Sequence, residues 1–221
     1  MTEQKPSVEI NVVSPGLLVI LTGPTAAGKT EIRERMVGKH RKLKSLVTTT
    51  SRPKRPSETD GIDYHFIDPE HFLQRVELGH FLEYAEYGGN LYGTTKDELE
   101  RVLRGEVLMS TMEISGAARF EEHVREAYDA QTAEQILSRS ITVYIDPGSE
   151  ETQRYRFIHR EAGLGNFETR LLQDRSMLKD FGDKFKHKVL NPDQEHIDKA
   201  IEGVEKLLEG VLQVQIGNLF S

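Results

Sequence analysis

The residues from Gly23 to Thr30 constrain the fold of this chain more than any other sequence feature. They spell Gly-Pro-Thr-Ala-Ala-Gly-Lys-Thr and match the pattern G-x-x-x-x-G-K-T of a phosphate-binding loop. The apolar residues 17–22 before the loop predict a buried strand, and residues 31–37 after it predict a helix. Because strand, turn and helix follow one another, we expect the backbone N–H groups of the turn and the helix N-terminus to surround an anion.

This loop predicts that the chain binds a nucleoside triphosphate. Lys29 places a positive charge beside the phosphates, and the Thr30 hydroxyl is a candidate ligand of Mg²⁺. The whole loop is therefore predicted to bind ATP, through Gly23, Pro24, Thr25, Ala26, Ala27, Gly28, Lys29 and Thr30.

The composition excludes several other classes of protein. With 221 residues, the chain can bury one good core with small inserted lobes. It has no cysteine, which excludes disulfides and thiolate chemistry, and no apolar stretch long enough to span a membrane. The formal net charge of −7 argues against broad binding to nucleic acids or acidic membranes. We therefore expect a cytoplasmic protein with neither nucleic-acid nor membrane partners.

Strand and helix patterns alternate along the chain, which is typical of an α/β fold with a parallel sheet and helices on both faces. Besides the first strand, residues 106–112 and 141–145 predict core strands. Three helices are also expected. One begins at Asp68-Pro69 and ends at Gly79, one runs from the capping box Thr95-x-x-Glu98 to Gly105, and one carries the apolar stripe from Ile197 to Val211.

Two segments interrupt this alternation and are predicted to be inserted lobes. Residues 51–94 are polar and rich in Tyr and Gly, and residues 149–170 are charged with little strand pattern. The predicted division is a tail at 1–15, a core at 16–50, 95–148 and 171–212, a substrate-binding lobe at 51–94, a lid at 149–170, and a tail at 213–221.

The first of these segments contains an arginine pair in a loop stiffened by prolines. Arg52 and Arg55 are three residues apart, and such a pair can hold one phosphate through planar, bidentate hydrogen bonds. Tyr64, further along the segment, can add a phenolic hydroxyl. An exposed basic turn is the alternative interpretation of this stretch on its own.

Glu83 lies in the apolar stretch Gly-His-Phe-Leu-Glu-Tyr and is a candidate for recognising a base. A carboxylate accepts two hydrogen bonds, and guanine offers two donors side by side on its Watson–Crick edge. Adenine presents an acceptor there, so a carboxylate would reject it. From spacing alone, an ordinary surface glutamate at a strand edge is an equal alternative.

Together these motifs make the chain resemble the guanylate kinase family from about residue 17 to residue 212. The motifs are G-P-T-A-A-G-K-T, T-T-S-R-P-K-R-P-S-E-T-D-G-I-D-Y-H-F, G-H-F-L-E-Y and G-G-N-L-Y-G-T, in family order and close to family spacing. A phosphate-binding loop alone occurs in many unrelated enzymes, whereas this ordered combination is highly specific.

The resemblance implies ATP-dependent phosphorylation of GMP, and of dGMP, with Mg²⁺. It implies that Arg52, Arg55, Tyr64 and Tyr92 hold the GMP phosphate, that Thr48, Glu83 and Thr94 recognise guanine, and that Glu58 orders the arginine loop. It also implies that Lys29 and three lid arginines, Arg156, Arg160 and Arg170, are the catalytic residues and contact the ATP phosphates. Asn191 is expected near the adenine. The sequence leaves open whether the protein is a monomer or a homodimer.

The chain departs from the family pattern at the end of the second core strand. The family usually has Asp-x-Asp there, whereas this chain has Thr111-Met112-Glu113, so one acid is absent and the other is longer. The lid is also one residue shorter than the family pattern between Arg160 and Arg170. Residues 116–140 form a longer segment, which is expected to be a surface helix and loop.

The sequence leaves two alternatives to a guanylate kinase. The first is a catalytically weak scaffold domain of the same fold that binds phosphopeptides, but such domains typically lose the lysine and glycines that this loop keeps. The second is a related P-loop kinase with a different phosphorylated acceptor, such as a sugar bisphosphate. The arginine pair, Tyr64 and Glu83 argue against it.

Overall fold

The computed structural model describes residues 16–56, 58–87, 89–159, 167–192 and 197–212. Its centre is a five-stranded sheet in the order β2-β7-β1-β8-β9, and every pair of neighbouring strands is parallel. In the register of this sheet, Val19 lies beside Met109 and Ile141. The strands are β1 (Leu17–Thr22), β2 (Leu43–Ser45), β7 (Val107–Thr111), β8 (Ser140–Asp146) and β9 (His187–Leu190).

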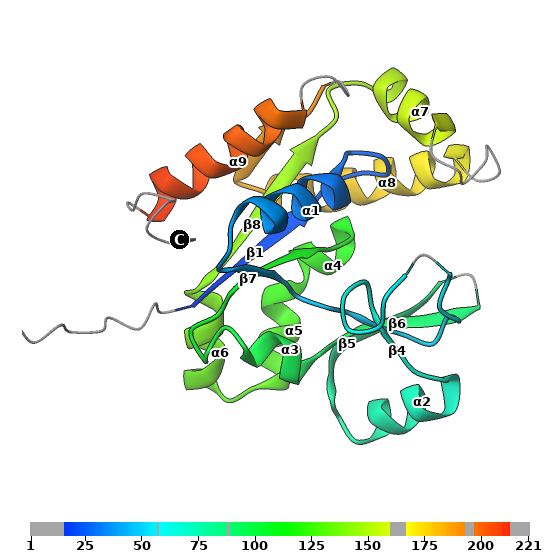
Figure 1. Cartoon of the computed structure of the whole chain (residues 1–221), viewed down its shortest axis with the longest axis vertical. Helices are drawn as coiled ribbons and strands as arrows, with labels where there is room; N and C mark the ends of the chain where they lie inside the picture. The colour runs from blue at the N-terminus through cyan, green and yellow to red at the C-terminus, as the bar shows by residue number, and fades with distance from the viewer. Residues whose placement is uncertain (1–15, 57, 88, 160–166, 193–196, 213–221) are drawn as a thin grey trace, which may run out of the picture.

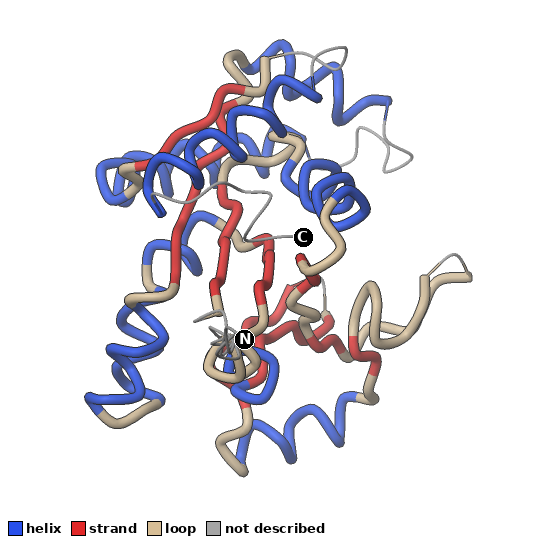
Figure 2. Tube along the Cα trace, turned by 60° about the vertical axis from the view of Figure 1, so that its left-hand side comes forward, coloured by secondary structure: helices blue, strands red, loops and turns tan. Residues whose placement is uncertain are grey.

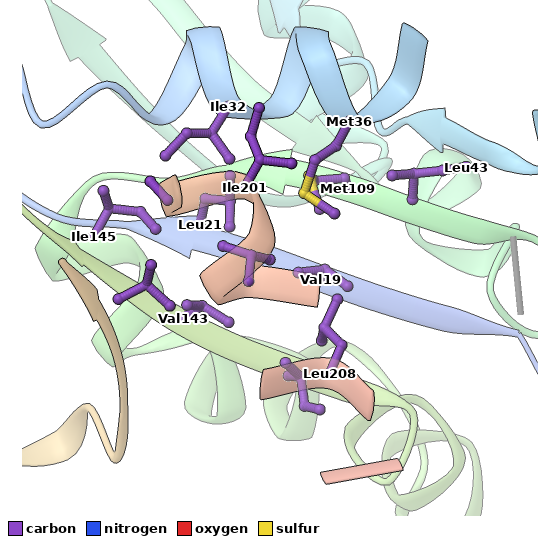
Figure 3. Packing of buried hydrophobic residues seen from close by; sticks show 14 of the residues in the cluster. Val19, Leu21, Ile32, Met36, Leu43, Met109, Val143, Ile145, Ile201 and Leu208 are labelled. Atoms are coloured by element: carbon purple, nitrogen blue, oxygen red, sulfur yellow. The ribbon is translucent and has the colours of Figure 1, made fainter. Parts of the chain in front are cut away.

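Alternate residues of β1 face opposite layers of helices because side chains alternate along a strand. Val19 and Leu21 pack against α1 (Lys29–Lys39) and α9 (Ile197–Leu212), as Figure 3 shows. Ile32 and Met36 of α1 are fully buried in this cluster, one turn apart on the helix. The phosphate-binding loop is therefore held between a buried strand and a helix that is anchored in the core.

Leu18 and Ile20 face the second layer of helices, which lies on the opposite side of the sheet (Figure 1). The cluster between this layer and the sheet buries Val124 and Ile136 completely and includes the stacked rings of Tyr144 on β8 and Phe185. Its helices are α3 (Lys96–Glu100), α4 (Ile114–Ala118), α5 (Phe120–Ala127), α6 (Ala130–Leu137) and α8 (Phe167–Phe181), with the 3₁₀ turn η1 (Gly182–Lys184).

A second, four-stranded sheet stands apart from the first, as Figure 2 shows. Its order is β4-β3-β6-β5, with β5 and β6 antiparallel, and Phe72 of its helix α2 stacks on Phe81 at a centroid distance of 4.3 Å. The elements are β3 (Thr49–Thr50), β4 (His65–Phe66), α2 (Pro69–Glu77), β5 (Phe81–Tyr87) and β6 (Asn90–Thr95).

The helix α7 (Glu150–His159) and the start of α8 lie beside the phosphate-binding loop. Its Phe157 forms a small buried cluster with Ala26 of the loop and with Phe167 and Leu171 of α8. The loop therefore contacts both of these helices. Among the helices described, none combines the length and the apolar character that a bilayer crossing requires.

Most of the elements expected from the sequence are confirmed, but the helix expected from Thr95 to Gly105 is wrong in its second half. The Thr95 hydroxyl accepts the Glu98 N–H at 3.4 Å, yet α3 ends at Glu100 and turns follow. The Glu98 carboxylate binds Arg101 at 2.6 Å and the Val47 N–H at 3.0 Å rather than closing the capping box. The segment expected as one surface helix and a loop is three short helices, α4 to α6.

Candidate active site

The phosphate-binding loop connects β1 to α1 and contains two glycines with positive φ, Gly23 at 144° and Gly28 at 93°. A Cβ atom on Gly28 would lie 2.4 Å from Asn191 Nδ2, so a larger residue would not fit there. The helix α1 begins at Lys29, and no side chain caps it. The N–H groups of its first turn point out of the helix end and are suited to bind an anion.

The Lys29 ammonium group lies over its own loop. Its Nζ atom donates to the carbonyl oxygens of Gly23 and Pro24, at 2.6 and 2.9 Å. Thr30, the next residue, is exposed.

The Thr30 hydroxyl fits a Mg²⁺ site only when phosphate oxygens complete it. Among the described residues, no group of three His, Asp or Glu side chains could hold a metal ion by itself. Mg²⁺ is usually bound by one or two protein oxygens together with substrate phosphates and water. This loop can provide that kind of site with ATP bound.

Two further residues expected to contact ATP, Arg156 of the lid and Asn191 near the adenine, lie at the same loop. Arg156 is 6% exposed, and its Nη1 atom is 3.4 Å from the carbonyl oxygens of both Ala26 and Ala27. Asn191 is completely buried and donates to the Ala27 carbonyl at 2.9 Å. Both side chains therefore support the backbone of the loop.

The other two lid arginines are placed differently. The guanidinium of Arg170, on α8, lies over the Phe157 ring at 5.8 Å from its centroid. Arg160 lies outside the described residues.

The arginine loop is ordered by Glu58. The Arg52 guanidinium donates to the Glu58 carboxylate at 2.6 Å, and the backbone N–H of Arg55 donates to its other oxygen at 2.8 Å. The hydrogen bond from Arg52 lowers the pKa of Glu58, so the carboxylate is ionised at neutral pH. The Arg55 side chain is exposed at the end of this loop.

Tyr64 and Tyr92 lie edge to face, with ring centroids 6.1 Å apart. The Arg52 guanidinium is 5.7 Å from the centroid of the Tyr64 ring, so the arginine and the phenol belong to one cluster. Burial raises the pKa of Tyr64, whereas the positive charges of Arg52 and Arg33 lower it. The phenol therefore stays protonated at neutral pH and can donate a hydrogen bond.

A cavity of about 760 Å³ lies between the second sheet and the core. Tyr64, Tyr92, Thr48, Glu83 and Thr94 line its wall on the second sheet. Glu83 on β5 is paired with Thr94 on β6, and one Glu83 oxygen accepts the Thr94 N–H at 3.1 Å. The volume lies within the range of 300–1,000 Å³ that is typical of small-molecule sites.

The opposite wall of the cavity belongs to the core and includes Thr111, Glu113, Arg119 and His123. Burial raises the pKa of Glu113, and the charges of Asp174 and Glu83 raise it further, whereas the charge of Lys29 lowers it. Glu113 therefore lies within electrostatic range of both the phosphate-binding loop and the base-recognition wall.

Three residues near this site are not among those that the sequence motifs predict: Arg119, His123 and Arg33. Arg119 and His123 are one helical turn apart and join the cavity wall only through the fold. The Nδ1 atom of His123 and the Nε atom of Arg33 are buried and have no hydrogen-bond partner among the described residues. Arg33 lies one turn after Lys29 on α1, a spacing that could have suggested a shared face.

Comparison with known proteins gives a consistent match. The sequence model of the guanylate kinase family matches residues 16–211. The guanylate kinase of Clostridium perfringens (strain SM101 / Type A) is 31% identical over 192 residues, which cover 86% of this chain and 82% of that protein. The guanylate kinase of Thermotoga maritima is 32% identical over 194 residues, which cover 87% and 86%. A crystal structure of guanylate kinase from Anaplasma phagocytophilum shares the fold, with a TM-score of 0.62 at 23% identity over 88% of this chain and 85% of that one.

Proposed function

The chain belongs to the guanylate kinase family, and on that premise we propose that it transfers the terminal phosphoryl group of ATP to GMP, and to dGMP, giving ADP and the nucleoside diphosphate. The observation that carries this proposal is a single cavity that extends from Glu83, suited to guanine, to Glu113, which is within electrostatic range of Lys29. No observation favours a scaffold domain or a kinase with another acceptor.

We propose that GMP binds on the wall formed by the second sheet. The carboxylate of Glu83 would accept hydrogen bonds from guanine, with the hydroxyls of Thr48 and Thr94 beside it. Arg52, Arg55, Tyr64 and Tyr92 would hold the phosphate. The support is that Arg52 and both tyrosines already form one cluster, and that Glu58 binds the Arg52 guanidinium and the Arg55 backbone N–H.

We propose that ATP binds at the loop formed by residues 23–30. Lys29 would exchange its contacts with the loop carbonyls for phosphate oxygens, and Arg156, Arg160 and Arg170 would add positive charge from the lid. Asn191 would lie close to the adenine. Mg²⁺ would be held by Thr30 and the phosphates, and when bound it would neutralise negative charge on the triphosphate.

The chemistry requires alignment and charge neutralisation rather than a general base. The nucleophile is a phosphate oxygen of GMP, which is already ionised at neutral pH. Two unit charges about 4 Å apart repel by about 4 kcal/mol at an effective dielectric constant of about 20, and several such pairs meet at this site. Lys29 and the arginines of both halves offset this repulsion, and closure of the second sheet over the core excludes water.

A single substitution tests whether donor and acceptor sites are separate. Lys29→Ala should abolish GMP-dependent formation of ADP, because the charge beside the phosphates is lost. GMP binding measured by calorimetry should change less than about threefold, because the proposed GMP contacts lie on the second sheet. Loss of GMP binding in this variant would contradict the assignment.

We further propose that the protein is cytoplasmic and is a monomer or homodimer. Sedimentation of the purified protein tests its oligomeric state.

A further inference from the structure

The apex of the phosphate-binding loop is held from outside the loop at the peptide groups of Thr25. The N–H of Thr25 donates to the Asp174 carboxylate of α8 at 2.7 Å, and its C=O accepts from Gln153 of α7 at 2.9 Å. Asp174 is 7% exposed and Gln153 is 4% exposed. Both contacts cross more than a hundred positions of sequence, so they exist only when α7 and α8 are docked on the loop.

The hydrogen bond from the Thr25 N–H to the Asp174 carboxylate is stronger than a typical backbone hydrogen bond. A buried carboxylate is costly unless it is hydrogen-bonded, and a bond that involves a charged acceptor is stronger than one between neutral groups. The negative charge of Asp174 extends into the site, since it raises the pKa of Glu113 and contributes to raising that of Tyr144. The Asp174 carboxylate therefore anchors the loop through the Thr25 N–H.

The residue next to this anchored peptide has an unfavourable backbone conformation. Ala26 has a φ of 59°, in the left-handed region that residues with a side chain rarely adopt. Its methyl group is buried against Phe157 of α7 and against Phe167 and Leu171 of α8. Such a conformation persists only where its surroundings hold it in place. Here the same two helices provide both the apolar contacts and the hydrogen bonds.

We propose that Asp174 is a positioning residue for the ATP site, which through the Thr25 N–H keeps the phosphate-binding loop in its binding conformation before ATP arrives. The role rests on the proposed function. A preformed loop does not have to be reorganised by the ligand, so affinity for ATP is higher. Asp174 does not line the cavity proposed for GMP, so we expect its main effect on ATP binding and only a small effect on GMP.

The test compares three variants of the full chain. Asp174→Ala should raise KM for ATP about tenfold, while kcat and KM for GMP stay within about twofold. Asp174→Asn should stay within about threefold of the unchanged protein, because its amide oxygen still accepts the Thr25 N–H. Asp180→Ala removes an exposed carboxylate from the same helix and should leave all three constants unchanged.

The proposal is overturned if Asp174→Ala leaves KM for ATP unchanged, or if it lowers kcat and raises both KM values alike. It is also overturned if the asparagine variant is as impaired as the alanine variant. Should Asp174→Ala not fold, Gln153→Ala removes the partner contact and must show the same selective rise.

ATP binding by calorimetry without GMP separates this inference from the proposed function. If the unchanged protein binds ATP but does not phosphorylate GMP, the proposed function fails. An affinity for ATP about tenfold weaker in Asp174→Ala would then still support the positioning role, and equal affinity would overturn it.

Discussion

Glu83 shows how one side chain links a fold position to substrate choice. It lies on β5 opposite Thr94, and the Thr94 N–H occupies part of its acceptor capacity. The rest of the carboxylate faces the cavity, where its oxygens can accept hydrogen bonds. A base that offers two donors is complementary to it, and a base that offers an acceptor is not.

Replacement of Glu83 by glutamine should therefore weaken discrimination between purines. The amide has one acceptor and one donor, so Glu83→Gln should lower kcat/KM for GMP about 100-fold, equivalent to about 3 kcal/mol, and reduce the ratio of GMP to AMP activity. Glu77→Gln, on the exposed face of α2 in the same lobe, is the matched control and should behave like the unchanged protein. Equal kinetics for both variants would remove Glu83 from base recognition.

The ionised form of Glu113 lowers the free energy of unfolding by an amount that depends on pH. Its pKa is raised in the folded protein, chiefly by burial, so its ionisation destabilises the fold. The penalty is absent below the unfolded pKa of about 4.5, grows as the pH rises toward the folded pKa, and is constant above it.

Glu113→Gln should consequently raise the melting temperature at pH 7 and leave it unchanged near pH 4. Glu122→Gln, an exposed position on α5, should change neither value. A Glu113→Gln variant that is less stable at pH 7 would show that the ionised carboxylate is favourable in the fold.

At the scale of elements, the turn after α3 is fixed by ionic contacts rather than by helix continuation. Arg101 binds both Glu98 and Glu106, and Lys44 of β2 binds Glu106 from the neighbouring strand. Hydrogen bonds from Arg101 and then Lys44 lower the pKa of Glu106 to about 2. This network connects β2 to the segment that enters β7.

Glu106→Gln should remove stability that depends on pH. Because the folded pKa is depressed, the contribution is full above the unfolded pKa of about 4.5 and is lost as the pH falls toward 2. Because Glu106 is partly exposed, solvent reduces this contribution. We therefore expect the Glu106→Gln variant to lose about 1 kcal/mol of unfolding free energy at pH 7 in urea denaturation, and less below pH 4.5. Glu202→Gln breaks a long, exposed pair with Lys206 and should cost almost nothing. A loss at Glu106 that did not change with pH would contradict the ionic account.

Prediction from sequence succeeds for elements whose pattern is local. The strand before the phosphate-binding loop and the strands β7 and β8 are short runs of mostly apolar residues, and α9 shows a helical apolar stripe, so each is visible within one stretch of sequence. By contrast β3 and β4 have two residues each, and only pairing with distant segments makes them strands. The early end of α3 depends on Arg101 and Glu106, a contact that no periodicity reveals.

At the scale of the whole molecule, the candidate site is divided between two sheets. The motifs for the loop, the arginine pair and Glu83 are local in sequence and can be predicted from it. The anchoring of Thr25 by Asp174 and the cavity wall at Arg119 and His123 depend on segments that meet only after folding. Residues within one motif can therefore be predicted to act together. The residues from distant segments that support or enclose them, such as Asp174, Arg119 and His123, cannot be predicted from the sequence.

This division gives the account its central claim, that the cavity holds a guanine-selective site at Glu83 and that Glu113 on its far wall lies within electrostatic range of an ATP site at Lys29. The most direct measurement is a coupled assay of ADP formation from ATP and Mg²⁺, with GMP, AMP, CMP and UMP compared as acceptors. We predict turnover with GMP, at least about 100-fold above the other three in kcat/KM. Absence of GMP-dependent ADP formation at millimolar substrate, with the protein shown to be folded by circular dichroism, would contradict the account.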